Sequence, residues 1–175
     1  RRQRQMCIRD RSYSTVITDW NGWIITLNIS APRVCEAGSI ASVVMEFNVV
    51  ERGGGVRLSI TNVTVSTGNI RVSKYVGVFH DVGSRKEVSI GFPLVKHDYA
   101  TLSRGATLRE NLTITLSGYI EYSDGNRQGL EYSYTLPLIV IAPQSPLKLS
   151  LKVDNYDNKY ELSTFIQNFG FTPLY

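Results

Sequence analysis

Two histidines are the residues of this 175-residue chain best suited to catalysis. His80 and His97 each precede an aspartate, a pairing that could serve a catalytic triad or a metal site. Adjacent residues on a strand point to opposite faces, however, so such a dipeptide rarely forms a site. Both histidines also lie near loop signals, where solvated polar side chains are common. We find no phosphate-binding loop and no dinucleotide fingerprint in the sequence, and we predict no catalytic residue.

Acidic residues near the end of the chain are the candidates for a metal site. Asp154, Asp157 and Glu161 lie close together, with Asn155 and Asn158 between them. Carboxylate and amide oxygens suit calcium, but the spacing lacks the glycine of an EF-hand loop and Lys159 lies inside the cluster. An ordinary polar turn is therefore favoured, and we expect no metal and no cofactor.

Aromatic residues offer a second kind of site, a platform on which a sugar could stack. Trp20, Trp23, Tyr119 and Tyr122 are the candidates, and only Tyr119 is clearly in the outward phase of its segment. Aromatic residues on sandwich strands are more often part of the core or its edge, so the platform is an alternative interpretation.

Three acceptor sequences for N-glycosylation begin at Asn28, Asn62 and Asn111. About two would arise by chance in a chain so rich in asparagine, serine and threonine, so their number says little. Asn28 and Asn111 fall in the outward phase of their predicted strands, which favours them slightly.

The first eleven residues, RRQRQMCIRDR, resemble the translation of a transposase-based sequencing-library adapter. This resemblance implies that residues 1–11 are not native, and we expect them to be disordered and to make no ordered contact with the core. It also implies that the gene is a shotgun fragment cut before its true start. The alternative is a basic arm for nucleic acid or membrane.

Without residues 1–11, the chain no longer has an excess of basic over acidic residues. The chain has 19 Lys and Arg against 15 Asp and Glu, and residues 1–11 contain five of those arginines and one aspartate. The remainder is formally neutral, so no electrostatic argument for nucleic-acid binding survives. No apolar run approaches the roughly 20 residues of a membrane helix, so we expect no membrane insertion.

Cys35 is the only cysteine outside residues 1–11. A single cysteine cannot form an internal disulfide, so we predict a small, buried apolar residue. A catalytic thiol would need a polarising histidine, and none lies nearby in the sequence. Pairing with a part of the protein that is missing from this fragment stays open.

The elements that must position these residues are strands, and the longest pair lies at 111–141. Apolar residues alternate there with polar ones on both sides of a turn, which is the period of a half-buried strand. The apolar positions have even numbers on both sides, so the turn must hold an odd number of residues. We predict a turn over 124–126 with Asn126 in the left-handed conformation, which sets Leu116 against Tyr134.

An Asn-Gly dipeptide at 21–22 is the strongest short hairpin signal in the chain. A two-residue turn there sets Trp20 against Trp23 and Thr18 against Ile25.

Further turn signals divide the rest of the chain. We expect the strand after the first hairpin to end at 31–32, glycines at 53–54 to pair Val49 with Leu58, and a bulge near 61–62. The predicted core rows in the same region are Trp23, Ile25, Leu27, Ile29, Ala41, Val43, Met45, Phe47, Val49, Val88, Ile90 and Phe92.

Seven to nine short strands, with a turn signal about every ten residues, indicate an all-β, Ig-like antiparallel β-sandwich. We assign residues 12–142 to this domain and residues 143–146 to a proline-containing linker. A new alternation follows, and we predict that residues 147–175 begin a second, truncated β domain. Two strands cannot build a stable sandwich, so Leu149 and Leu162 should be more exposed than the core.

A family resemblance is carried by the last residues, YELSTFIQNFGFTPLY. The alternating strand, followed by Asn168-X-Gly170 and a small apolar cluster, makes residues 146–175 resemble the start of a CARDB-type Ig-like domain. Such domains are adhesion-related modules of bacterial and archaeal surface proteins, and the resemblance implies no catalytic residue. Residues 12–142 resemble archaeal extracellular β-sandwich domains in general pattern.

These observations favour a non-catalytic structural or adhesive module of an extracellular or cell-surface protein with tandem Ig-like domains. Its expected partners are neighbouring Ig-like domains, other surface proteins or glycans. One alternative is an accessory carbohydrate-binding module of a secreted hydrolase, which would require exposed, coplanar aromatic rings. Another is a pilus-type subunit, which would require a hydrophobic helix upstream.

Overall fold

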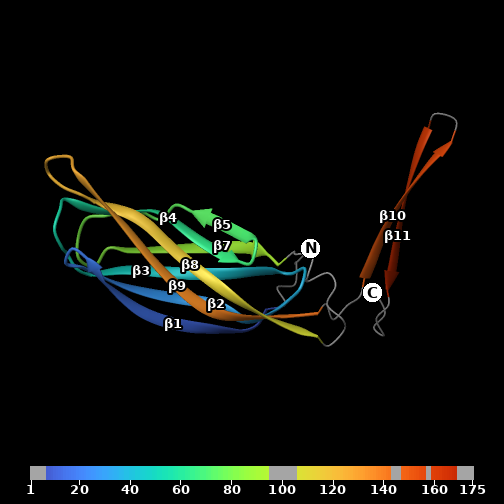
Figure 1. Ribbon diagram of the computed structural model, residues 1–175, viewed down its shortest axis with the longest axis horizontal. Helices are drawn as coiled ribbons and strands as arrows, with labels where there is room; N and C mark the ends of the chain where they lie inside the picture. The colour runs from blue at the N-terminus through green and yellow to red at the C-terminus, as the bar shows by residue number, and fades with distance from the viewer. Residues whose placement is uncertain (1–6, 95–105, 143–146, 157–158, 169–175) are drawn as a thin grey trace.

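The computed structural model describes the backbone of residues 7–94, 106–142, 147–156 and 159–168, and the side chains of residues 11–94 and 106–142. The described chain is all-β, as predicted, with eleven strands. Nine of these strands form a mixed sheet that curls into a nearly closed sandwich (Figure 1). In the described part of the chain, no helix is long and apolar enough to cross a membrane.

The sandwich has two halves. The first half holds, in spatial order, β1 (Cys7–Trp20), β2 (Trp23–Glu36), β3 (Ile40–Glu51) and β7 (Arg85–Pro93). The second half holds β9 (Arg127–Ile141), β8 (Thr107–Glu121) and β4 (Arg57–Thr67), and then β5 (Ile70–Lys74) and β6 (Gly77–Phe79), which pair with successive parts of β4.

Two contacts join the halves. On one side, Val34–Glu36 of β2 runs parallel to Ile139–Ile141 of β9. On the other side, the Lys74 ammonium of β5 donates a hydrogen bond to the Ser89 carbonyl of β7, at 3.2 Å. The curled sheet therefore encloses one core.

The predicted core rows on β2, β3 and β7 are confirmed, because every residue in them is at most 5% exposed. On β4 and β8 the inward row continues with Leu58, Ile60, Val63, Leu112, Ile114 and Leu116, all fully buried. Burying one such aliphatic side chain contributes about 1.5–3 kcal/mol, so these rows supply the main driving force for folding.

The first hairpin turns at Asn21 and Gly22, both with positive φ, and it pairs Trp20 with Trp23 as predicted. The predicted pairing of Thr18 with Ile25 is wrong, since Ile17 faces Ile25 instead. Ile17 and Trp20 are both buried although they are three positions apart. Strict alternation cannot place both on one face, so the strand bulges between them.

β2 does not end at Ala31-Pro32, contrary to prediction, but continues to Glu36. Its pairing with β3 stops at Ser30, and its pairing with β9 starts at Val34. Pro32, which has no backbone N–H, lies in the interval between these partners. A strand tolerates proline where no ladder bond is needed, so the chain changes neighbours there without ending.

The predicted hairpin at Gly53-Gly54 is also wrong, because β3 pairs with β2 and β7 and has no edge left for β4. The backbone of Val49 is already bound, with its N–H donating to the Ser84 carbonyl at 3.0 Å. Residues 53–55 instead carry the chain across the end of the sandwich. There the Gly54 N–H donates to the Asn21 carbonyl at 2.9 Å.

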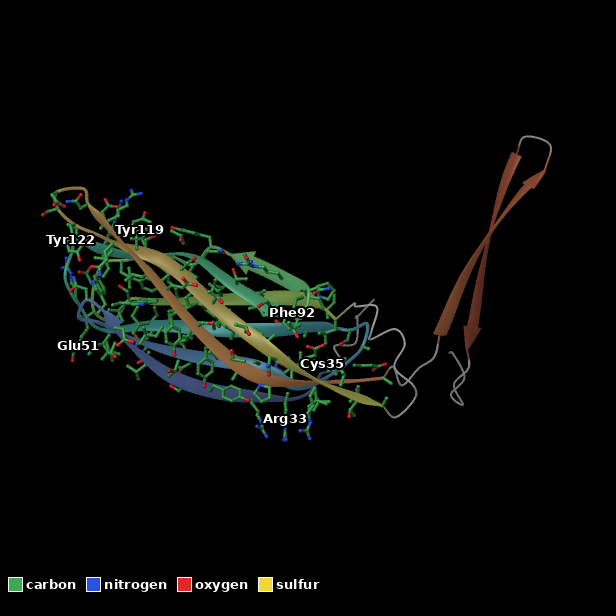
Figure 2. All side chains as sticks on the ribbon, in the orientation of Figure 1. Arg33, Cys35, Glu51, Phe92, Tyr119 and Tyr122 are labelled. Carbon is green, nitrogen blue, oxygen red and sulfur yellow. The ribbon has the colours of Figure 1, made fainter. Side chains whose placement is uncertain are left out.

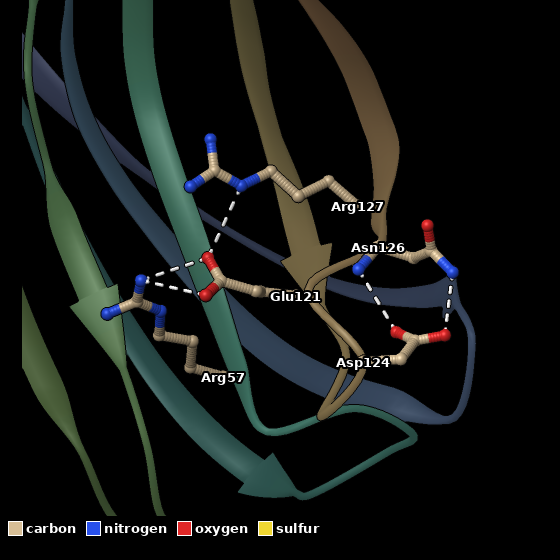
Figure 3. Close-up of polar contacts among 5 residues, drawn as sticks. All are labelled: Arg57, Glu121, Asp124, Asn126 and Arg127. Atoms are coloured by element: carbon tan, nitrogen blue, oxygen red, sulfur yellow. Dashed lines mark hydrogen bonds and ion pairs between the residues drawn. The ribbon is translucent and has the colours of Figure 1, made fainter.

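In the β8–β9 hairpin the parity argument holds, but the predicted register is wrong by two residues. Leu116 faces Tyr132 rather than Tyr134. The residue with positive φ is Gly125, not Asn126. Asp124 fixes this turn, because its carboxylate accepts hydrogen bonds from the backbone and side-chain nitrogens of Asn126, at 3.0 and 2.6 Å (Figure 3).

The predicted bulge near 61–62 is confirmed, between the pairs Ile60–Gly118 and Asn62–Ser117. A Cβ atom at Gly118 would collide with the Ser59 carbonyl. Glycine is therefore required at this position because two backbones approach closely.

β1 begins at Cys7, and residues 7–11 pair with the end of β2, from Arg11 opposite Ala31 to Cys7 opposite Cys35. The expectation that residues 1–11 make no ordered contact is therefore wrong for 7–11, while residues 1–6 lie outside the described residues. Because β2 is longer than predicted, it offers backbone groups that an extended segment can satisfy.

Cys35 is fully buried, as predicted, but it is disulfide-bonded. The only other cysteine of the chain is Cys7. The prediction that Cys35 makes no internal disulfide is thus wrong for the full chain. That prediction set Cys7 aside together with the adapter-like segment.

β10 (Leu147–Tyr156) and β11 (Lys159–Asn168) form a second, two-stranded antiparallel sheet. The side chains of Leu149 and Leu162, whose exposure was predicted, lie outside the described side chains, and the expected linker at 143–146 lies outside the described residues.

Candidate functional site

The outer surface of β4, β8 and β9, here called the hydroxyl face, is built from the residues that alternate with the buried rows. Thr113 of β8 lies between Ser66 of β4 and Thr135 of β9 in the ladder. The next row along the strands is Thr64, Thr115 and Ser133, and the one after it is Asn62, Ser117 and Glu131. Alternation in three neighbouring strands therefore brings short hydroxyl and amide side chains together on one surface.

Hydrogen bonds between side chains link this face across strands. The hydroxyls of Thr113 and Thr135 lie 3.5 Å apart, and those of Thr64 and Ser73 lie 2.8 Å apart. Such groups can bind polar ligands, but an unactivated hydroxyl is not a nucleophile, which needs an adjacent base.

An ion-pair row closes one end of the hydroxyl face (Figure 3). One nitrogen of the Arg57 guanidinium donates to both oxygens of Glu121, at 3.0 and 2.9 Å, and Arg127 lies 3.3 Å from the same carboxylate. The hydrogen bond that Arg57 donates lowers the pKa of Glu121, and the same bond raises the pKa of Arg57. Arg127 also stacks over the Tyr119 ring, with 4.5 Å between the guanidinium carbon and the ring centroid.

The aromatic platform, which was the alternative interpretation, is not formed. Trp20 and Trp23 are only 3% and 0% exposed, so neither presents a ring to solvent. The Tyr122 hydroxyl accepts a hydrogen bond from the Asn21 amide and donates one to the Gln128 side chain, both at 2.7 Å. These hydrogen bonds link two turns at one end of the sandwich, so Tyr122 has a structural role there.

The other end of the hydroxyl face opens into a groove of about 680 Å³, here called the basic groove. Figure 2 shows Arg33 toward this end and Tyr119 and Tyr122 near the opposite end. The residues that line the groove are Arg11, Arg33, Ser66, Gly68, Arg109, Glu110, Asn111, Thr113, Pro137, Leu138 and Ile139. Three guanidinium groups against one carboxylate make the lining of this groove basic.

Arg33 and Arg109 are brought together by the junction of the two halves. Arg109 faces Ile139 in the β8–β9 ladder, and Ile139 faces Val34, the residue after Arg33, in the β9–β2 ladder. Sequence reasoning missed this pair because the junction depends on β2 continuing past Pro32. No local pattern around either arginine indicates it.

The three glycosylation candidates occupy different environments. Asn28 and Asn111 are exposed, which confirms their outward phase, while Asn62 is half-buried at the β4 bulge. The Asn62 amide donates to the Thr64 hydroxyl at 3.3 Å, and Thr64 is only 4% exposed. Asn28 and Asn111 are therefore the more accessible acceptors.

The catalytic and metal candidates do not converge among the described side chains, where no group of three His, Cys, Asp or Glu could hold a metal ion. His80 is exposed after β6, and His97 lies outside the described residues. Asp154 and Glu161 face each other in the backbone ladder of the second sheet. Their side chains, and Asp157 entirely, lie outside what the structure describes.

No family model matches the chain, and no curated protein matches it.

Proposed function

We propose that this chain is a non-catalytic structural or adhesive module of an extracellular or cell-surface protein. The observation that supports this proposal best is the hydroxyl face, where short hydrogen-bonding side chains of three neighbouring strands alternate with an apolar core. Such a face can contact glycans or other proteins through many weak polar bonds. The exposed acceptors Asn28 and Asn111 also fit a secreted protein.

We also propose that the sandwich belongs to a series of tandem Ig-like domains, as the resemblance of residues 146–175 to CARDB-type domains implies. The order of its strands differs from that of an antibody constant domain, because β2 and β3 are neighbours in one half. The proposal therefore concerns the two-layered architecture that many surface modules share. Its partners would be neighbouring domains, other surface proteins or glycans.

The disulfide of Cys35 does not support the proposed location, although disulfides are typical of oxidising compartments. Its only available partner in the sequence, Cys7, belongs to the adapter-like segment.

Carbohydrate binding in a secreted hydrolase is the second candidate function, and the basic groove favours it. Because both tryptophans are buried, the basic groove is the feature that could hold a sugar.

Brief protease treatment of intact source cells tests the proposed location. We expect mass spectrometry to find peptides from residues 12–142 among the released fragments, with ribosomal proteins absent as the control for lysis. Recovery of these peptides only after cell lysis would contradict an extracellular location. Purified protein should also give no turnover of glycoside and peptide substrates, and turnover above buffer would contradict a non-catalytic role.

A further inference from the structure

We propose that the basic groove binds an acidic sugar, with Arg33 and Arg109 holding the carboxylate or sulfate group of the ligand. This inference rests on the proposed adhesive function and names the chemical class of its partner. Charge, the reach of the two arginines and the polarity of the surrounding wall support it.

The charge of the groove favours an anion. The guanidinium groups of Arg33 and Arg109 make no ion pair or hydrogen bond to any described residue, whereas Glu110 is engaged in an interaction of its own. A guanidinium presents its N–H donors in a planar fork that matches carboxylate and sulfate oxygens. Two such groups in one concavity, neither with a partner among the described residues, form a site for an oxyanion.

The positions of the two arginines allow them to share one anion. Arg109, Ile139 and Val34 form one row across three strands. Arg33 is next to Val34 in sequence, and the side chains of Arg33 and Arg109 line the same groove. Neighbouring strands lie about 4.8 Å apart, so the two arginine backbones are separated by about 10 Å. Long arginine side chains can close that distance around a group of a few ångströms.

The rest of the wall favours a sugar over an acidic peptide. The side chains of Ser66, Asn111 and Thr113 offer hydroxyl and amide groups, and Pro137 offers an exposed apolar ring. β8 is already paired with β4 on one side and β9 on the other, so a peptide strand cannot pair with β8 in the groove. A volume of about 680 Å³ lies within the usual range of ligand pockets.

Arg11 also lines the groove, but it belongs to the adapter-like segment. We therefore assign binding to Arg33 and Arg109, both of which lie in residues 12–142.

Calorimetric titration of the full chain with tetragalacturonate tests the proposal, and the fully methyl-esterified tetramer serves as the uncharged control. We expect binding of the acid and, for the ester, an affinity at least about tenfold lower, because charge-assisted hydrogen bonds are lost. Arg33→Gln and Arg109→Gln should each weaken binding by about tenfold or more. Arg85→Gln removes one exposed positive charge on β7 and should change affinity by less than about twofold.

Unchanged melting temperatures would show that the Gln variants remain folded, and Arg33→Lys, which keeps the charge but loses the fork, should also bind more weakly. Equal binding of tetraglutamate or of inorganic sulfate would overturn the assignment to a sugar. Binding that depends on Arg11 alone would overturn the assignment to Arg33 and Arg109. Absence of any binding would overturn this inference, while the protease experiment on intact cells would still report on the proposed surface location.

Discussion

The Glu121 carboxylate of β8 is bonded to the Arg57 guanidinium of β4 through both of its oxygens. Arg127 of β9 approaches the same carboxylate from the other side, at 3.3 Å. One acidic residue therefore links three neighbouring strands at the end of the hydroxyl face. The arrangement follows from the register, because Arg57, Glu121 and Arg127 occupy a single row of the two ladders.

Glu121→Gln should reduce the dependence of stability on acid pH. The hydrogen bond from Arg57 lowers the pKa of Glu121 below its ordinary value, so the folded state binds this proton less readily than the unfolded state. The resulting stabilisation is present above the unfolded pKa of about 4.3 and is lost as the pH falls through the lower folded pKa. Urea unfolding at about pH 7 and about pH 3 should show a difference between parent and variant that shrinks in acid.

Glu131→Gln is the matched control, since Glu131 is exposed on the same face and has no ion pair to a described side chain. It should leave the acid dependence unchanged. Equal acid sensitivity of the parent and the Glu121→Gln variant would show that the ion-pair row does not affect stability.

Gly118→Ala should destabilise the fold by about 1–3 kcal/mol or more, because a Cβ atom there would strike the backbone of Ser59 rather than a movable side chain. Gly129→Ala serves as the control, since a Cβ atom at Gly129 would meet nothing within 4 Å. That substitution should change the free energy of unfolding by no more than about 0.5 kcal/mol. Similar chemical denaturation curves for both variants would mean that β4 and β8 do not approach closely at the bulge.

Leu116→Ala should cost about 2–5 kcal/mol of unfolding free energy, because Leu116 is fully buried and its removal leaves a cavity. Val16→Ala removes methyl groups from a residue that is 54% exposed, and should cost no more than about 0.5 kcal/mol. A small effect at Leu116 would show that the even-numbered face of β8 is not the core.

Alternation alone predicted which face of β8 is buried, since the side-chain period is two whatever the register. Alternation could not give the register, because both candidate turns hold three residues. The two turns differ only in which residue adopts positive φ. Gly125 adopts this conformation with less steric cost than Asn126, and Asp124 then stabilises the turn. The preference of glycine for positive φ therefore favours the observed pairing of Leu116 with Tyr132.

The basic groove could not be predicted from the sequence, because it depends on contacts between distant strands. Arg33 and Arg109 have no shared local pattern. Pro32 also predicted that the strand ends just before Arg33. Only the parallel contact of Val34 with Ile139 brings the two arginines to one surface. Buried rows follow from local periodicity, whereas this groove follows from the closure of the sandwich.

Sequencing of the source DNA with a ligation-based library tests our proposal that residues 1–11 are an adapter translation. We expect codons upstream of Ser12 that do not encode RRQRQMCIRDR. The physical consequence is that residues 12–175 would then hold no second cysteine for Cys35. Recovery of the same eleven codons from unamplified DNA would show that the segment, its strand and its cysteine are native.

Expression in a host that glycosylates Asn-X-Ser/Thr sequences should modify Asn28 and Asn111 more fully than Asn62. The first two are exposed, whereas Asn62 is half-buried and its amide is bonded to the nearly buried Thr64. Glycopeptide mass spectrometry measures the occupancy of each site. Full occupancy at Asn62 alone would contradict the accessibility argument.

A glycan on Asn111 should also block the basic groove, because Asn111 forms part of its wall. Glycosylated protein should therefore bind tetragalacturonate more weakly than protein from a host without this modification. Asn111→Gln should restore binding in the glycosylating host, whereas Asn28→Gln, which removes a glycan from the other half of the sandwich, should not. Equal binding by glycosylated and unmodified protein would show that the ligand and Asn111 do not share the groove.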